Sequence, residues 1–184
     1  SKGVYNKMHP YTKFPEQPSE AYQQAVVRAA LEEAYREIPD KDGIIDFARS
    51  SIIIAKDFVK EAEILTLPPD PVEIIVMPEF QRGVTLAYCD SPGPLETGLK
   101  TFYAVSPLPE EWTDEQVRSY LREYNKRSVH NLTIHEAMPG HFVQLAHSNR
   151  YPSTLRAVLS SGVFIEGWAV YTERVFLEEG FLDH

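Results

Sequence analysis

Residues 135–144 read His-Glu-Ala-Met-Pro-Gly-His-Phe-Val-Gln, and the interpretation of the whole chain starts from this stretch. Zinc prefers imidazole nitrogens and carboxylate oxygens as ligands. The familiar HExxH pattern places two histidines at i and i+4 on one helix face. Here the spacing from His135 to His141 is i+6, which separates them by about 240° around a straight helix. Because Pro139 interrupts the hydrogen-bond ladder and Gly140 permits unusual dihedral angles, we expect a break that returns His141 to the side of His135.

A second stretch, residues 164–173 (FIEGWAVYTE), places the carboxylate of Glu166 in an otherwise apolar helix. Burying an unpaired charge costs several kcal/mol, so such a carboxylate is expected to face a cation or another partner. The set His135, His141 and Glu166 therefore predicts a three-ligand zinc site with one position left for water. Glu136, beside the first ligand, is the predicted general base.

Other interpretations of these residues stay open. Glu166 could form an ion pair with Arg156 or Arg174, and a His-Glu pair followed by a nearby histidine also occurs by chance. A di-iron carboxylate protein is a third reading, but such sites use Glu-x-x-His pairs. The sequence offers none, because the residues three positions after Glu136, Glu166 and Glu173 are Pro139, Ala169 and Phe176.

Further polar residues near the two motifs are secondary candidates. Glu173, at i+7 from Glu166, lies near the same helix face and either orients a ligand histidine or is a surface charge. Gln144 is expected to support the site or the local structure. Tyr171 and His147 could donate a hydrogen bond to an oxyanion, with packing or solvent exposure as the alternative. His130 lies off the face of His135 and is not expected to be a ligand.

The rest of the chain reads as α+β and mostly helical, with a small sheet between helical segments. Residues 1–18 are expected to form an extended arm, residues 19–67 an antiparallel helical hairpin, and residues 68–184 the segment that carries the site. Ser19 is a predicted N-cap, and Thr113 with Gln116 fits a capping box. Periodicity, capping residues and Pro or Gly breaks predict helices over 19–37, 44–65, 113–126, 128–147 with a break at 139–140, and 155–179, and strands over 72–77, 85–89 and 100–106.

Composition excludes several classes of protein. The chain has 184 residues and a net charge of −9, so it lacks a general attraction for nucleic acid or anionic lipid. Its single cysteine allows neither an intrachain disulfide nor a cysteine-based zinc site. No apolar run approaches the roughly 18 residues of a membrane span, and the first residues lack the apolar region of a signal peptide.

The paired motifs resemble the bacterial domain of unknown function 885, whose members carry HExxPGHxxQ followed by EGWA. The stretches VEIIVMPEF (72–80) and TFYAVS (101–106) are also similar to the family pattern. That family is placed with the zincin-like metallopeptidases in which glutamate is the third ligand. The resemblance implies one zinc ion held by His135, His141 and Glu166, with Glu136 as the catalytic base of a peptidase-like hydrolase. A catalytically inactive zincin-like binding or scaffold domain is the alternative.

The resemblance has further implications. The substrate would be a peptide or small amide. Separately, because the strand at 100–106 precedes the motif helix, it is expected to lie at the edge of the cleft and to pair with an extended substrate. Relatives carry helical sequence on both sides of this segment, so we expect a longer parent chain whose missing parts complete the cleft. Relatives are often exported, which points to the bacterial periplasm or cell surface, with the cytoplasm left open.

Overall fold

The computed structural model describes residues 18–96 and 98–182, and it confirms the α+β class. The predicted arm at residues 1–18 lies outside the described part of the chain except for Pro18. The elements, in chain order, are α2 (Glu20–Ala34), α3 (Ile44–Glu61), β1 (Val72–Val76), the 3-10 turn η1 (Glu79–Gln81), β2 (Ala87–Asp90), β3 (Thr101–Val105), α4 (Asp114–Glu123), α5 (Lys126–Glu136), α6 (His141–Asn149), α7 (Thr154–Val158) and α8 (Gly162–Glu178).

Side chains that satisfy free backbone N–H groups set the starts of these helices. Ser19 accepts a hydrogen bond from the Tyr22 amide, and Thr113 and Gln116 form the predicted capping box of α4. Asn125 caps α5 by accepting from the Arg127 and Ser128 amides, a cap that the sequence reading missed. The helix that leads to the histidine motif therefore begins two residues earlier than predicted.

The three strands form a mixed sheet in the order β1-β3-β2. β1 pairs with β3 in parallel, and β2 pairs with β3 antiparallel, with Cys89 opposite Tyr103. β3 is therefore the central strand and both of its edges are already paired. The expectation that residues 100–106 border a cleft and pair with a substrate is wrong for this reason, and β2 is the edge strand on that side.

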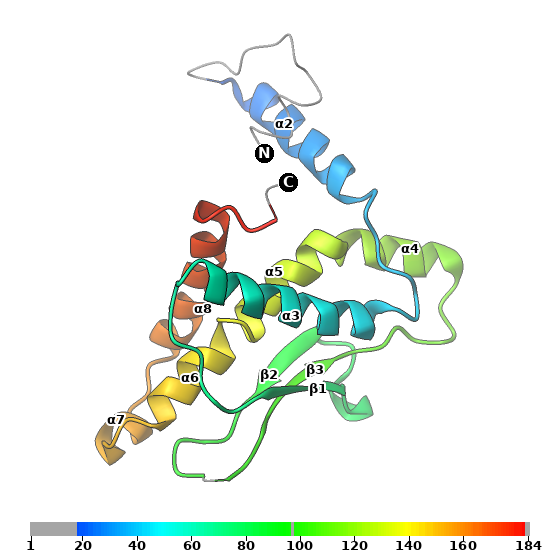
Figure 1. Ribbon diagram of the computed structural model, residues 1–184. Helices are drawn as coiled ribbons and strands as arrows, with labels where there is room; N and C mark the ends of the chain where they lie inside the picture. Colours follow the sequence, from blue (N-terminus) through cyan, green and yellow to red (C-terminus); the bar gives the residue numbers. More distant parts are fainter. Residues whose placement is uncertain (1–17, 97, 183–184) are drawn as a thin grey trace.

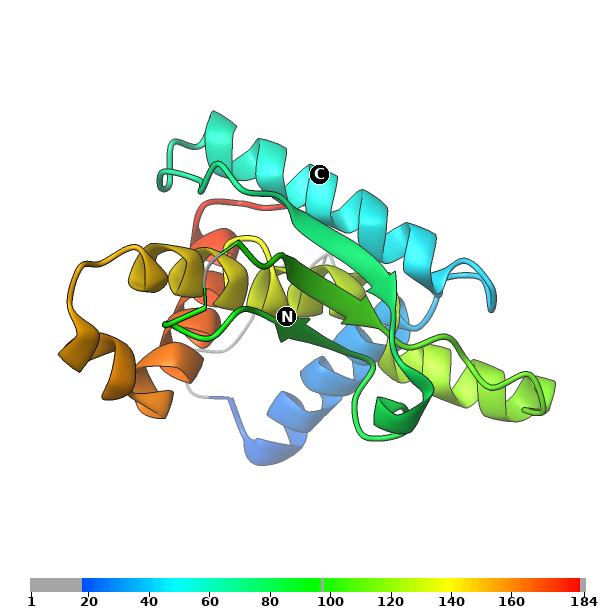
Figure 2. The same ribbon diagram turned by 90° about the horizontal axis from the view of Figure 1, so that it is seen from below.

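The core lies between the sheet and the pair α3 and α5. Figures 1 and 2 show these two helices side by side against one face of the sheet, with α8 beyond α5 and α6. Tyr103 of β3 is fully buried there, and its hydroxyl lies 3.3 Å from Thr133 Oγ1 of α5. The central strand is thus packed directly onto the helix that carries the histidine motif. From α3 the core receives Ile44, Ala48, Ile52, Ala55 and Val59.

α2 and α3 lie apart in both views, so their packing differs from the antiparallel hairpin expected for residues 19–67 (Figures 1 and 2). The physical reason is the distribution of apolar surface. α3 buries its apolar face against α5 and the sheet, whereas α2 buries only Val26. The C-terminal end of α2 is held by polar contacts to the α4–α5 junction, including the Lys126 amide donating to the Glu37 carbonyl at 2.8 Å.

Candidate metal centre

The junction between α5 and α6 brings the two histidines together. The amides of Ala137 and Met138 both donate to the Thr133 carbonyl, and the Gly140 amide donates to the Ile134 carbonyl. These bonds span four, five and six residues, so the chain widens where Pro139 prevents a regular turn. α6 then begins at His141. The rings of His135 and His141 consequently lie 4.8 Å apart between centroids, nearly perpendicular to each other.

Glu166 reaches the same place from α8. Its Oε2 lies 3.6 Å from His135 Nε2 and 3.7 Å from His141 Nε2, and one ligand atom from each of the three residues lies within 4.8 Å of the others. The Trp168 indole N–H donates to the Pro139 carbonyl at 3.0 Å and ties α8 to the α5–α6 junction. The three predicted ligands thus converge, although they come from three separate helices.

Glu166 is exposed, whereas the sequence analysis expected a carboxylate buried in an apolar helix. Its side chain is 68% exposed, whereas those of His135 and His141 are 21% and 12% exposed. Desolvation therefore does not force Glu166 toward a cation. The ion-pair alternative is not seen either, because Arg174 pairs with Glu178 and Arg156 lies over the Tyr151 ring. Glu166 meets the histidines because α8 packs against α5 and α6.

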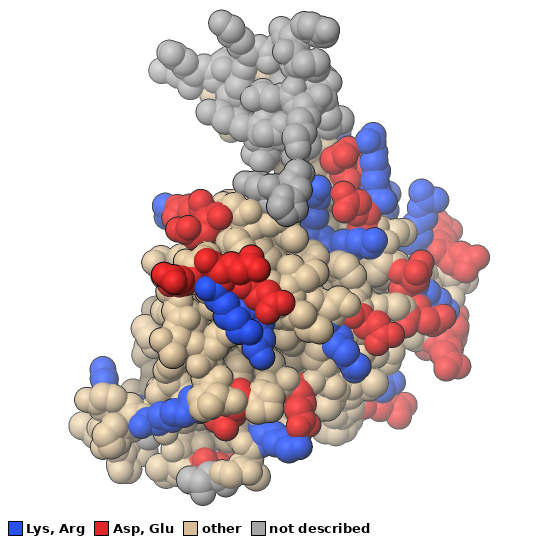
Figure 3. All heavy atoms as spheres, in the orientation of Figure 1, with Lys and Arg blue, Asp and Glu red and all other residues tan. Residues whose placement is uncertain are grey.

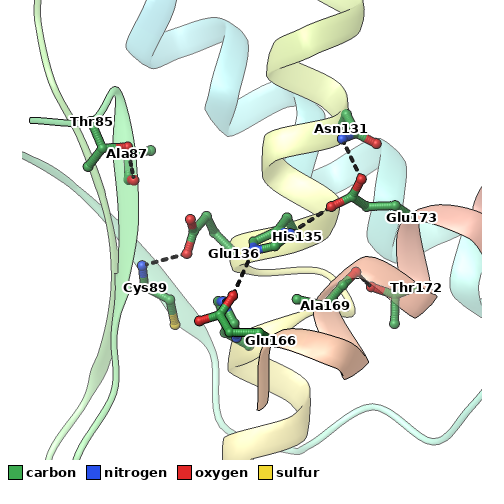
Figure 4. A network of polar contacts seen from close by, with 11 residues as sticks. Thr85, Ala87, Cys89, Asn131, His135, Glu136, Glu166, Ala169, Thr172 and Glu173 are labelled. Carbon is green, nitrogen blue, oxygen red and sulfur yellow. Dashed lines mark hydrogen bonds and ion pairs between the residues drawn. The ribbon is translucent and has the colours of Figure 1, made fainter. Parts of the chain in front are cut away.

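A second carboxylate holds His135 from its other side. Glu173 Oε1 lies 2.6 Å from His135 Nδ1, and Glu173 Oε2 accepts from the Asn131 side-chain amide at 2.8 Å (Figure 4). Of the two alternatives left open for Glu173, this contact favours the one in which it orients a predicted ligand. Asn131 was missed by the sequence reading. Its position four residues before His135, on the same face of α5, was the available signal.

Glu136 points away from the histidine rings, toward the sheet edge. Its Oε2 accepts a hydrogen bond from the Cys89 amide of β2 at 3.1 Å, and Figure 4 shows the carboxylate between that strand and His135. Burial raises the pKa of Glu136, and the charge of Glu166 adds to this effect. His135 and the Cys89 N–H act in the opposite direction. A raised pKa moves a carboxyl group toward the range in which general acid–base catalysis operates.

His141 is set up as a neutral imidazole. Burial lowers its pKa, and the proximity of His135 acts in the same direction against the opposing effect of Glu166. Its Nδ1 is buried and has no hydrogen-bond partner among the described residues, as is also true of Gln144 Oε1 on the next turn of α6. The neutral form of imidazole is the one that binds metal ions.

The remaining candidates lie outside this cluster. Tyr171 is largely exposed, and its ring centroid lies 6.2 Å from that of Trp168. His147 Nε2 lies 2.9 Å from the Thr66 carbonyl, so it holds the segment after α3. His130 Nδ1 lies 2.7 Å from Ser51 Oγ on α3, which fits the expectation that it is not a ligand. Among residues 18–96 and 98–182, no hydrogen bond or ion pair joins Tyr171 or His147 to His135, His141, Glu166 or Glu136.

Comparisons with known proteins identify similar sequences and folds. A family model described as "Bacterial protein of unknown function (DUF885)" matches residues 7–184. No curated protein matches the chain. A solved structure of a "putative lipoprotein of unknown function" from Shewanella oneidensis is 35% identical, with a TM-score of 0.78 over 98% of this chain and 31% of its own. A "putative lipoprotein" from Colwellia psychrerythraea is 25% identical, with a TM-score of 0.66 over 98% and 29%. The chain thus spans about a third of the length of these two structures.

Proposed function

Since the chain belongs to the bacterial DUF885 family of unknown function, and since its two family motifs converge on one cluster, we propose that it is the zinc-binding core of a metallopeptidase or amidase. The observation that carries this proposal is the meeting of His135, His141 and Glu166 beside the partly buried carboxyl group of Glu136. The chain spans only part of the length of its relatives. The proposed activity therefore refers to a protein of their full length as well as to this chain.

The donor set fits zinc in both chemistry and spacing. Two imidazole nitrogens and one carboxylate oxygen are the ligands of many catalytic zinc sites. Ligand atoms about 2.1 Å from a tetrahedral ion would be about 3.4 Å from one another. The distances from Glu166 Oε2 to His135 Nε2 and His141 Nε2, 3.6 and 3.7 Å, are close to that value. The bond from Glu173 to His135 Nδ1 leaves Nε2 as the nitrogen that faces the other ligands.

The role of Glu136 follows from its contacts. A bound zinc ion would supply a Lewis acid that lowers the pKa of water and polarises a carbonyl group. Because Oε2 of Glu136 is occupied by the Cys89 amide, Oε1 is the oxygen assigned to accept a proton from the attacking water. Glu136 then delivers that proton to the leaving nitrogen of the amide. Burial raises the pKa of Glu136, which makes it a stronger base for the first transfer.

The substrate class follows from the neighbouring edge of the sheet. β2 lies beside the cluster and pairs with β3 on one side only. An extended peptide could add to such an edge through the backbone groups other than the Cys89 N–H, which already donates to Glu136, and the Ala87 carbonyl, which accepts from Thr85. Peptides or small amides are therefore the substrates proposed. None of the described helices combines the length and apolarity that a membrane crossing requires. A periplasmic or cell-surface location is proposed from the descriptions of the two similar structures.

The decisive first experiment measures bound zinc per chain by plasma mass spectrometry. We expect about one zinc ion in the wild type and a small fraction of that in Glu166→Ala. The matched control is Glu179→Ala, at another exposed position of the same region, which should retain the metal. A folded wild type that holds no zinc after incubation with the ion would refute the site.

A second experiment separates a hydrolase from the alternative, an inactive scaffold domain on the same fold. Glu136→Gln should keep the zinc ion but abolish cleavage of a defined peptide mixture followed by mass spectrometry. The partly buried acid beside the ligands favours the enzyme, because a structural zinc site has no need for a base there. A wild type that binds zinc and cleaves none of the peptides would favour the scaffold.

A further inference from the structure

A cavity of about 540 Å³ lies where β3 ends, between residues 82–85 and 106–112. The Ser106 amide still donates to the Leu86 carbonyl at 2.7 Å. Pro107 and Pro109 then have no N–H with which to continue the pairing, so the chain turns away from the sheet and the gap remains. None of the predicted zinc ligands lines this cavity.

Three aromatic side chains form one wall of the cavity: Trp112, Tyr120 and Tyr124. The ring centroids of Trp112 and Tyr120 are 5.0 Å apart, with the ring planes at 71°, and those of Tyr120 and Tyr124 are 4.6 Å apart. All three side chains are partly buried, and they lie on α4 or within two residues of its ends. Tyr124 precedes His135 by about 16 Å at the helical rise of 1.5 Å per residue, so this wall is separate from the metal centre.

The three rings are free of internal cations among the described residues. The basic side chains on either side of Tyr124 lie over other rings, Arg122 at 4.4 Å from the Tyr35 centroid and Lys126 at 5.9 Å from the Phe47 centroid. An ammonium group near the face of Trp or Tyr is attracted by the ring quadrupole. The aromatic wall therefore has an attraction for cations that the described part of the chain does not use.

The charged side chains that line the cavity are mostly acidic. Glu79, Glu110 and Glu111 oppose a single cation, Arg82. Arg82 is held against the backbone, because its Nε donates to the Met77 carbonyl at 2.9 Å. Within the described ranges 18–96 and 98–182, none of the three carboxylates forms an ion pair. The lining thus has unpaired negative charge beside its aromatic wall.

The sequence around the cavity adds to this negative charge. Residues 110–115 read EEWTDE, with four carboxylates and no basic residue. In Figure 3 acidic side chains gather on the right of the view, over the start of α4. Lys41 donates to the Glu110 carbonyl at 3.4 Å, but it does not line the cavity. The field at the cavity is therefore negative on balance, which favours a cation and disfavours an anion.

We propose that this cavity binds a small organic cation, with its ammonium group against the aromatic wall and beside the carboxylates of Glu110 and Glu111. The volume lies within the range of small-molecule sites, about 300–1,000 Å³. Aromatic rings and carboxylates together select for positive charge, whereas an aromatic wall alone would accept any apolar group. The inference does not depend on zinc binding or catalysis.

The test compares choline with dimethylbutanol, its uncharged isostere, in which a carbon atom replaces the nitrogen. The chain has two tryptophans, so NMR of the nitrogen-labelled protein follows two indole N–H signals, which Trp112→Phe assigns. Trp112 reports on the cavity, and Trp168, which donates to the Pro139 carbonyl, reports on the metal centre. We expect choline to shift the Trp112 signal saturably, to bind about tenfold more tightly than dimethylbutanol, and to leave the Trp168 signal in place.

Two double variants that remove equal charge test the carboxylates. Glu110→Gln with Glu111→Gln should weaken choline binding about fivefold. Asp114→Asn with Glu115→Gln, in the same acidic segment but outside the cavity lining, should weaken it less than about twofold. Equal affinity of the wild type for choline and dimethylbutanol would overturn the inference, because the cavity would then not distinguish charge. A Trp112 signal that neither compound shifts would also overturn it. Neither result alters the zinc content that tests the proposed function.

Discussion

The carbonyl oxygen of His135 occupies the space in which a side chain at Gly140 would begin. A Cβ atom at Gly140 would lie 1.7 Å from that oxygen and 2.4 Å from the Ile134 carbonyl oxygen. Both neighbours are backbone atoms, so they cannot rotate away. The return of His141 toward His135 therefore depends on glycine at this position, because the α5–α6 junction closes on itself there.

Gly140→Ala should consequently lower the free energy of unfolding by about 3 kcal/mol or more, since the junction must open to accept a methyl group. It should also weaken zinc binding, because His141 moves with the junction. Urea denaturation measures the first effect and metal titration the second. Gly167→Ala is the matched control. Its Cβ would meet no atom within 4 Å, so alanine in this helix interior should stabilise by about 0.5–1 kcal/mol. Equal effects of the two substitutions would contradict the close approach at Gly140.

Glu173→Gln should weaken zinc binding by about 10- to 100-fold, because His135 loses the carboxylate that orients its ring. Glu178→Gln, on the exposed side of the same helix, should leave the affinity unchanged. Competition with a chromophoric chelator measures both values. An unchanged affinity in Glu173→Gln would show that the contact is only structural.

Asn131→Ala tests the hydrogen bond from Asn131 to Glu173, the carboxylate that contacts His135. Because Asn131 reaches His135 only through Glu173, its loss should weaken zinc binding less than Glu173→Gln does. The two substitutions should be non-additive when combined, as expected for residues in one network. Fully additive losses in the double variant would indicate that Asn131 acts independently of Glu173.

The stability of the fold should fall as the pH drops below about 6.5, in part because of His130. Burial lowers the pKa of His130 in the folded chain, so the unfolded chain binds a proton that the folded chain resists. Its contribution to stability is therefore complete above the ordinary histidine pKa of about 6.5 and declines as pH falls toward the lower folded value. Comparing Tm between pH 5.5 and 7.5 should show a shallower slope in His130→Gln than in the wild type. Identical slopes would exclude the contribution.

Cys89 should be a slow thiol in the folded chain. Burial raises the pKa of Cys89 to about 12, and the nearby charges of Glu136 and Asp90 add to this effect. At pH 8 its thiolate fraction is then on the order of a thousandfold below that of an ordinary cysteine. Ellman's reagent should react at the normal rate only after denaturation. Equally fast reactions in buffer and in guanidinium would contradict the buried environment.

Much of the local structure could be predicted from the sequence. Thr113 and Gln116 form their capping box, and Pro139 with Gly140 ends α5 where the i+6 spacing of the histidines requires a break. These features depend on a few consecutive residues, whose propensities and hydrogen bonds act over one or two turns. The types of the candidate ligands could also be predicted, because imidazole and carboxylate side chains are known metal ligands wherever they occur in a sequence.

The arrangement of these elements was decided by tertiary structure. The sequence did not show that β3 would be central and β2 the edge strand, because strand order depends on which apolar faces can be buried together. It left Glu173, Tyr171 and His147 as secondary candidates, and only the packing of α8 on α5 brings Glu173 to His135. The residue types of the candidate centre are thus given by residues 135–141 and 166. Its geometry comes from contacts between helices far apart in the chain, which no local pattern encodes.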